Sequence, residues 1–409
     1  MRRVVILGGF LALGFAPAGR LDGQVVDRAR AESEAAGQAA EADRLFQRGD
    51  WEPAMAIYEA ERASRAALGD VRYEAYALRA IGVCRAEMGD DEGAIESWTR
   101  ARVLDLKRDD QGYAGYDDFL IARAQLRLNR VGEGVASLER ALPRLSKAVD
   151  RDHEADARLV LTRTLVGLGR SEAARPHVAR ALALAEKLDD AWRRADAWAS
   201  SGQVEGALGN PSLALERFSD ARELFEQQGR AGDAAWMETV SGSTLILLGR
   251  PDLALARYEE AARLHEHLED GGSLSEDLAA IAGLHLEAGR VEPALAAARK
   301  AVEQARDADD REREVEARVR LAQVQARQND WAAAAETLDE AVGLVRQVAR
   351  DDSAEQIRIL LTAAQADRRA GRELRALARL EAAGKLANES GHAPLRQAVA
   401  DARRGLPDK

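Results

Sequence analysis

The side chains with the widest chemical capacity in this sequence are six histidines, and their spacing forms no reactive centre. They are His153, His177, His265, His267, His285 and His392. None belongs to an HExxH pattern, and His265 and His267 are two residues apart, so they point in different directions on a helix. The sequence contains no GxSxG nucleophile motif, no phosphate-binding loop and no GxGxxG motif after a strand. We therefore expect a chain that is not an enzyme and that holds no metal ion and no cofactor.

Cys84 is the only cysteine of the 409-residue chain, which excludes an intramolecular disulfide and a zinc site built on thiolates. Its apolar neighbours Ile81 and Met88 predict an ordinary buried core residue. The net charge of −11 argues against a nucleic-acid partner, because such proteins usually present a basic surface. The carboxylates are interspersed with lysine and arginine, as is typical of solvated helix faces.

The first residues of the chain have the organisation of a secretory signal peptide. Arg2 and Arg3 precede the apolar run VVILGGFLALGF, which is followed by the small-residue sequence APAG. The run is too short to span a bilayer, which requires about 20 apolar residues. We therefore expect residues 1–18 to direct export to a bacterial periplasm or cell surface; the alternative is a buried N-terminal helix. No later segment is long and apolar enough to cross a membrane.

A constant spacing of 40 residues organises the rest of the chain, with a last interval of 42. Residues suited to ending a helix recur at this spacing. They are Gly49, Gly89, Asn129, Gly169, Gly209, Gly249, Gly289, Asn329 and Gly371. Glycine and asparagine enter the left-handed backbone conformation at the lowest cost, so each of them predicts the corner between two antiparallel helices.

Three further columns of residues flank these corners. Seven residues before each corner stands a small residue, with Thr162 as the exception. Five residues after the corner stands an alanine, or Gly134 in one repeat, and from the second repeat on a second alanine follows seven residues later. Four residues after the first alanine the side chain is usually bulky, as in Tyr58, Trp98 and Phe218. Spacings of three and four place these columns on one helix face, so each bulky side chain is framed by small ones.

Taken in register, these columns resemble the tetratricopeptide repeat family, and the resemblance covers about residues 33–388 as nine repeats. It implies an all-α fold, a right-handed superhelical solenoid of antiparallel helix pairs. The period is 40 rather than the commoner 34, and the family's usual proline at the end of the second helix is absent. The longer repeat is similar to those of bacterial signalling regulators and of proteins with a CHAT peptidase domain.

Acidic pairs occupy the junctions where that proline would stand. They are Asp109-Asp110, Asp189-Asp190, Glu269-Asp270, Asp309-Asp310 and Asp351-Asp352. An aspartate before a helix caps its free N–H groups, and we favour this role over calcium binding because no junction has the ligand density of a calcium loop. Pro143 and Pro176 fall inside second helices and should bend or delay them, so we expect the third and fourth repeats to be the least regular.

In arrays of this family the first helix of each pair lines the concave side, so the register also predicts a groove. Seven candidate partner-binding residues fall on that side. They are Tyr76, Arg79, Tyr116, Phe119, Arg123, Arg163 and Gln203. Arginine and aromatic side chains dominate binding hot spots, and an arginine binds a carboxylate with two hydrogen bonds, which suggests an anionic peptide or chain terminus as the ligand. The alternative is that the rings pack between repeats and the arginines pair with neighbouring acids.

The function predicted from the sequence is a non-catalytic, exported scaffold that holds a protein or peptide partner in this groove. The first alternative is a sensor or regulatory arm that acts on a separate effector chain. A sugar-binding platform is a weaker alternative, because the inward aromatic residues are thinly spread.

The predicted organisation is a signal peptide over residues 1–18, a flexible lead over 19–32, the repeat array over 33–388, and a capping helix with a loose tail over 389–409. Part of the lead could join the first helix. In the capping helix, Leu395 and Val399 share one apolar face.

Overall fold

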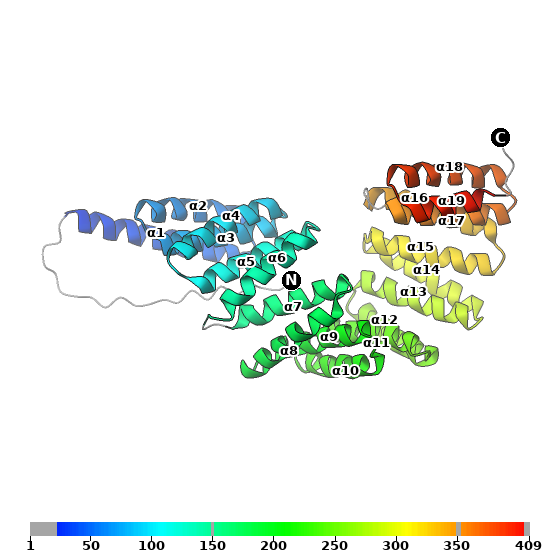
Figure 1. Cartoon of the computed structure of the whole chain (residues 1–409), viewed down its shortest axis with the longest axis horizontal. Coiled ribbons are helices and arrows are strands. Elements are labelled where there is room, and N and C mark those ends of the chain that lie inside the picture. Colours follow the sequence, from blue (N-terminus) through cyan, green and yellow to red (C-terminus); the bar gives the residue numbers. More distant parts are fainter. Residues whose placement is uncertain (1–22, 149–150, 349–352, 405–409) are drawn as a thin grey trace. The chain divides into compact units, whose positions relative to one another are not determined.

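The computed structural model describes residues 23–148, 151–348 and 353–404, and all regular structure within these ranges is α-helical (Figure 1). The predicted signal peptide, residues 1–18, lies outside the described ranges. Nineteen helices form nine successive pairs and a last single helix, which confirms the predicted all-α solenoid of helix pairs. No helix among the described residues is long and apolar enough to cross a membrane.

The chain divides into two compact units, Met1–Val160 and Leu161–Lys409, with the division inside α7. The first unit contains α1 (Gly23–Arg48), α2 (Trp51–Ala67), α3 (Val71–Glu87), α4 (Asp91–Lys107), α5 (Gln111–Arg127), α6 (Val131–Leu145) and the first part of α7 (Asp152–Gly167). The second unit contains the rest of α7, α8 (Ser171–Lys187), α9 (Ala191–Ala207), α10 (Pro211–Gln227), α11 (Ala231–Leu247), α12 (Pro251–His267), α13 (Gly271–Glu287), α14 (Val291–Asp307), α15 (Arg311–Arg327), α16 (Trp331–Val348), α17 (Ser353–Arg369), α18 (Glu373–Glu389) and α19 (Ala393–Arg403).

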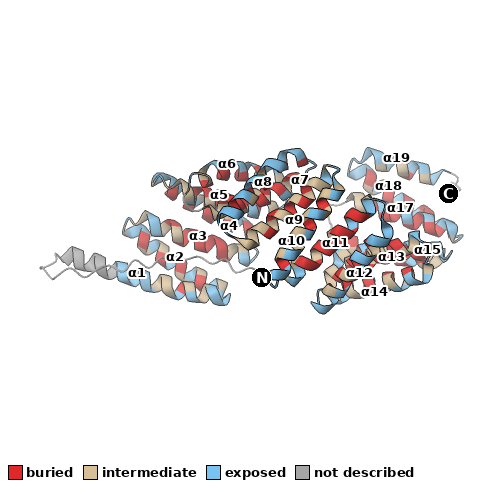
Figure 2. Cartoon of the chain, turned by 90° about the horizontal axis from the view of Figure 1, so that it is seen from below, coloured by how far each residue is buried: buried red, intermediate tan, exposed pale blue. Residues whose placement is uncertain are grey.

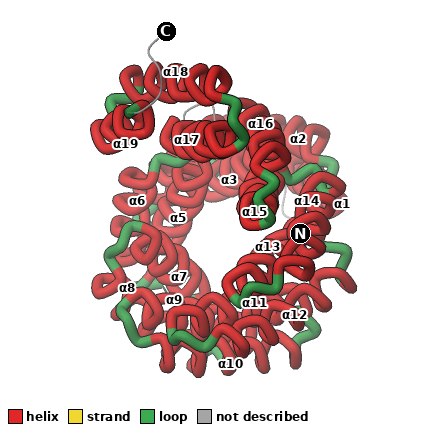
Figure 3. Tube along the Cα trace, turned by 90° about the vertical axis from the view of Figure 1, so that its right-hand side faces the viewer, coloured by secondary structure: helices red, strands yellow, loops and turns green. Residues whose placement is uncertain are grey.

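Most helices are 17 residues long and are joined by three-residue turns, which Figure 3 shows as short loops between the helices. All nine residues predicted to form left-handed corners have a positive φ, which confirms the prediction. A hydrogen-bond pattern typical of helix ends closes each corner: the N–H of Asp90 donates to the carbonyl of Arg85 (2.9 Å), and that of Gly89 donates to the carbonyl of Ala86 (3.1 Å). From α1 to α6 and from α8 to α19, each helix packs against the next one in the chain.

A second set of left-handed corners, which the sequence analysis did not identify, lies at the junctions between pairs. These residues are Gly69, Asp109, Asp189, Gly229, Glu269, Asp309 and Gly391. The corner therefore recurs at a half-period of 20 residues, and the turn between two repeats has the same backbone conformation as the turn within one.

The acidic junctions cap the helices that follow them. The side chains of Asp110, Asp190, Asp270 and Asp310 accept hydrogen bonds from backbone N–H groups three residues later, at 3.2, 2.9, 3.1 and 3.1 Å. This confirms the capping role at four of the five junctions, and the fifth, Asp351-Asp352, lies outside the described residues.

The predicted columns of small and bulky residues pack against each other across each helix pair, and the buried faces follow these columns (Figure 2). The ring of Trp98 on α4 lies against Gly82 on α3, and that of Tyr258 on α12 lies against Gly242 on α11. A Cβ atom added at Gly242 would be 2.8 Å from the Tyr258 ring, which is closer than a van der Waals contact. These glycines are therefore required by the close approach of a ring.

Pro143 and Pro176 differ in their effect on the helices that contain them, whereas the sequence predicted that each would disturb its helix. Helix α6 ends at Leu145, two residues after Pro143, and has 15 residues where most other helices have 17. The second helix of the third repeat is therefore shortened close to its proline. Helix α8 begins at Ser171, in the register of the other second helices, so Pro176 does not delay the helix, and the alternative effect, a bend, stays a prediction. Pro176 is far enough inside the helix to remove one hydrogen bond without moving the helix start.

At the two ends of the described chain, α1 begins at Gly23, so helix covers most of the residues expected to form the lead. Helix α19 is the predicted capping helix, in which Val399 is buried and Leu395 packs against the same apolar cluster.

Candidate functional site

The predicted groove residues of the first unit lie on α3 and α5, but they differ in exposure and in bonding. Tyr76 on α3 is half-buried, and its hydroxyl donates to Oδ1 of Asp43 on α1 (3.1 Å). The hydroxyl of Tyr58 on α2 donates to the same oxygen (2.6 Å). Burial, and then Asp43, raise the pKa of both phenols, so both remain protonated donors at neutral pH. Tyr76 is therefore a bridge between repeats.

The second group of groove residues is an aromatic cluster on α5. Phe119 is buried, and its ring centroid lies 6.3 Å from that of the half-buried Tyr116. The imidazole of His153 on α7 also contacts Tyr116, with ring centroids 4.1 Å apart and the rings tilted by 43°. Arg123 is exposed, and its guanidinium lies 5.8 Å from the centre of the Phe119 ring. The cluster thus joins an apolar platform to an exposed cation, which is suited to an anionic group attached to an apolar one.

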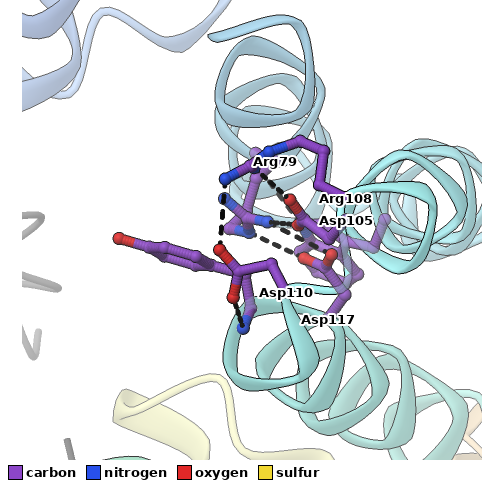
Figure 4. Close-up of polar contacts among 7 residues, drawn as sticks. Arg79, Asp105, Arg108, Asp110 and Asp117 are labelled. Atoms are coloured by element: carbon purple, nitrogen blue, oxygen red, sulfur yellow. Dashed lines mark hydrogen bonds and ion pairs between the residues drawn. The ribbon is translucent and has the colours of Figure 1, made fainter. Parts of the chain in front are cut away.

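Arg79 lies inside the first unit rather than on an open surface. Its side chain is buried, donates from Nε to Oδ1 of Asp117 on α5 (2.7 Å) and also pairs with Asp105 on α4 (Figure 4). Arg108 extends the network by bonding Asp105 (2.9 Å) and Asp110 (3.2 Å). Arg79 therefore connects three helices, which is the alternative considered from the sequence, and it is not available to a partner.

Burial dominates the electrostatics of this network. It raises the pKa of Asp117 to about 7, although the positive charge of Arg79 opposes the shift, and it also raises the pKa of Asp105. The two carboxylates in turn raise the pKa of Arg79, so the guanidinium remains charged. A buried ion pair of this kind is costly to break, because removing one partner leaves an uncompensated charge.

The remaining two candidates, Arg163 on α7 and Gln203 on α9, belong to the second unit. The Arg163 side chain is 43% exposed and lies 3.7 Å from Asp196 on α9, and Gln203 is half-buried on the same helix. The structure thus places Tyr116, Phe119 and Arg123 together on one helix, whereas it places Arg163 and Gln203 with the second unit.

Buried acids that were not predicted also hold these helices together, although the sequence carried a signal for them. Asp117 and Asp277 stand in a column, repeated every 40 residues, that is otherwise filled by small or apolar residues such as the fully buried Ala77, Ala157 and Ala197. Each acid has its own polar partners. Asp277 lies 2.7 Å from Nδ1 of His265 and accepts a hydrogen bond from the hydroxyl of Thr239 (2.7 Å). A charge in a column of small residues therefore predicts a buried polar network.

The described residues contain no group of three or more histidine, cysteine or acidic side chains placed to hold a metal ion. The polar clusters that the structure does contain are ion pairs and hydrogen-bond networks between helices. Such clusters can hold helices in position and can bind charged groups.

A family model described as a MalT-like TPR region matches residues 169–383. No curated protein sequence matches the chain. Among solved structures, the apo form of RapI is similar over 90% of this chain and 97% of its own, with 14% identity and a TM-score of 0.60. A Rap protein complexed with Competence and Sporulation Factor is similar over 91% and 99%, with 14% identity and a TM-score of 0.53.

A third similar structure is a signal transduction ATPase with numerous domains, from Pyrococcus horikoshii, which has a tetratricopeptide repeat sensor. It is 13% identical, covers 86% of this chain and has a TM-score of 0.58. The chain spans 55% of the length of that ATPase. At these identities the likeness shows the fold.

Proposed function

Because the chain belongs to the family of MalT-like tetratricopeptide repeat (TPR) regions, we propose that it is a non-catalytic scaffold that binds a protein or peptide partner through the first helices of its repeats. The observation that carries this proposal is the aromatic cluster on α5. Its exposed cation, Arg123, has no carboxylate partner among the residues that the structure describes, whereas Arg79 is fully engaged. A ligand that brings a carboxylate can therefore bind Arg123 without breaking an existing ion pair.

The similarity to a Rap protein complexed with Competence and Sporulation Factor supports the proposal at the level of the fold, since that array also accommodates a bound factor. We expect the preferred ligand to contain an anionic segment, because the exposed charge of the cluster is positive.

The test is a charge reversal at the predicted groove. The variant Arg123→Glu should lose the partner that the unaltered mature chain captures from its own envelope fraction, as identified by mass spectrometry. A matched control is Arg396→Glu, which makes the same change in net charge at an exposed position of α19. If the groove variant captures the same partner in the same amount, the proposed site is wrong.

Export is a second part of the proposal, and it rests on the basic and apolar pattern of residues 1–18. Fusion of residues 1–30 to a reporter enzyme that is active only outside the cytoplasm should give activity. Replacing the leucines of the apolar run by aspartate should abolish that activity. A fusion that stays inactive would contradict export.

A regulatory role on a separate effector chain is the second candidate function, and the likeness to the ATPase with a TPR sensor favours it. Under this alternative, the captured partner would be an enzyme whose rate changes when the repeat protein is added. A partner whose activity is unaffected would favour the scaffold.

A further inference from the structure

A pocket of about 250 Å³ lies in the second unit between α10, α11 and α12. Three arginines, Arg222, Arg250 and Arg257, line it together with Glu238. The rest of the wall consists of apolar side chains and two serines. They are Leu215, Phe218, Leu245, Leu253, Ser219 and Ser241. The pocket thus combines an excess of positive charge with an apolar surface in a small volume.

Glu238 holds two of the arginines in place. Its side chain is 2% exposed, and its carboxylate lies 3.2 Å from the Arg222 guanidinium and 3.0 Å from that of Arg257. One buried negative charge therefore fixes two cations, and each guanidinium keeps further N–H donors. Two other carboxylates lie near these arginines in the sequence. Glu226 lies 3.2 Å from the Arg222 guanidinium, and Glu260 pairs with Arg263, which does not line the pocket.

Arg250 is the third arginine, and the repeat register shows why it is unpaired. Three repeats earlier the same position is Arg130, which forms an ion pair with Glu92. The position equivalent to Glu92 is Ser212, which cannot supply a charge. No ion pair or side-chain hydrogen bond of Arg250 falls within the described part of the chain, and the side chain is exposed. The pocket therefore contains a cation with unused hydrogen-bonding capacity.

The pocket opens on the face of α11 opposite to the predicted groove. Ser241 and Leu245 line it and are four residues apart, whereas Ser243 is the position on this helix that corresponds, at the 40-residue spacing, to the predicted groove residues Arg163 and Gln203. A residue two positions away lies about 200° around a helix, so Ser243 faces the other side. A ligand in the pocket and a partner in the groove can thus be bound at the same time.

The size of the pocket restricts the ligand. Its volume exceeds the roughly 150 Å³ of a cavity that accepts benzene, and it is below the roughly 300 Å³ at which pockets for drug-sized molecules begin. The ligand part that enters is therefore about one residue in size. A residue that carries both a carboxylate, for the planar guanidinium groups, and an apolar side chain, for the accessible Leu215 and Leu253, matches this lining.

We propose that this pocket binds the free C-terminal carboxylate of a peptide whose last residue is apolar. Only at a chain end do the carboxylate and a leucine-like side chain belong to the same residue. An internal glutamate presents its carboxylate on a flexible stem and leaves the apolar wall to a different residue. The proposal is independent of the groove residues, so the two sites can fail or succeed separately.

Calorimetric titration of the full chain with three acetylated tetrapeptides tests the proposal. The first ends in leucine with a free carboxyl group, the second is its C-terminal amide, and the third has an internal glutamate and an amidated end. The free acid should bind at least about tenfold more tightly than the amide, since charge-assisted hydrogen bonds are lost in the amide. Equal affinity for acid and amide, no binding of the acid at millimolar concentration, or tighter binding of the glutamate peptide would each overturn the proposal.

Variants assign the effect to the pocket. Arg250→Gln should weaken binding of the free acid about tenfold and reduce its advantage over the amide. Arg130→Gln, at the equivalent position of the first unit, should leave the affinity unchanged. Because Arg250 is exposed, its variant should retain the circular dichroism and the melting temperature of the original chain. An unchanged affinity of the Arg250→Gln variant, or an equal loss in Arg130→Gln, would show that the peptide binds elsewhere.

Discussion

At the scale of single residues, the distribution of buried charge distinguishes one repeat from another. Most positions of the buried columns hold alanine, yet Asp117 and Asp277 occupy the same column and each is held by a polar partner from a neighbouring helix. Glu61 on α2 is a different case. It is fully buried, neither carboxylate oxygen accepts a hydrogen bond, and Arg65 lies 3.5 Å from Oε1. The titration of such a group should make the free energy of unfolding depend on pH.

Burial raises the pKa of Glu61 from 4.5 to about 7, against the opposing effect of Arg65, while Asp43 and Asp70 add to the rise. The folded chain therefore binds this proton more tightly than the unfolded chain does. The resulting stabilisation is complete below pH 4.5 and is lost as the pH rises to 7, by at most about 3 kcal/mol. In Glu61→Gln this dependence should disappear, so the variant should gain stability relative to the original chain between pH 4.5 and 7.

Urea unfolding at several pH values measures this difference. Glu59→Gln on the exposed side of the same helix is the control, and it should follow the original chain. Parallel stability curves for the original chain and Glu61→Gln would show that Glu61 keeps an ordinary pKa in the folded state.

Complementary pairs of small and bulky residues lead to the second prediction. A methyl group at Gly202 would overlap the ring of Phe218, whereas an earlier repeat combines Ala122 with Leu138 at the same two positions. Gly202→Ala should therefore destabilise the chain by about 1–2 kcal/mol, despite the better helix propensity of alanine. Adding Phe218→Leu should recover part of this loss, with a coupling energy of about 1 kcal/mol in a double-mutant cycle. Strictly additive effects of the two substitutions would show that the ring does not set the size limit at position 202.

At the scale of helices, the corners show what the sequence could reveal and what it could not. Every corner within a pair was predictable, because glycine or asparagine fills that column without exception. The corners between pairs were harder to recognise, because that column mixes residue types. It holds Gly69, Gly229 and Gly391 but also Asp109, Asp189, Asp309 and Glu269. Their acidic character indicated a cap, and the cap is formed by the next residue. The same limit applied to the site. Register placed Arg79 on the groove side, but it could not show that two buried acids already bind it.

Substitutions at the two acidic residues of one junction should therefore change the stability of the chain in opposite directions. Glu269 has a φ of 57°, so Glu269→Gly should relieve backbone strain and stabilise the chain by about 0.5–1 kcal/mol, after allowance for the greater freedom of glycine when unfolded. Asp270 caps α13 through the N–H and the hydroxyl of Ser273, so Asp270→Ala should destabilise the chain by about 1 kcal/mol. Thermal unfolding of both variants measures the signs. A loss of stability in Glu269→Gly would mean that its side chain contributes more than its backbone conformation costs.

At the scale of the whole molecule, the chain consists of units in which each helix packs mainly on its neighbours in sequence. In such an array stability is close to a sum of local terms, so damage should remain near its source. Two register-equivalent carboxylates provide a matched pair for this test. Asp118 on α5 is fully buried among Arg102, Arg140 and Arg144, and Glu238 on α11 occupies the same position three repeats later.

Replacing either acid by alanine removes a buried carboxylate from half-buried and exposed arginines. Water can solvate these arginines, so the local cost should stay below the about 3–5 kcal/mol of a fully buried pair. Asp118→Ala should accelerate backbone hydrogen exchange in α4, α5 and α6 while α10 to α12 keep their protection. Glu238→Ala should give the reverse pattern and should also loosen the pocket by releasing Arg222 and Arg257. Hydrogen exchange with mass spectrometry resolves the two sets of helices within each sample, so each variant is the control for the other. If both variants lost protection equally along all described helices, the array would unfold as one cooperative body, and a ligand in the pocket would then stabilise the first unit as strongly as the second.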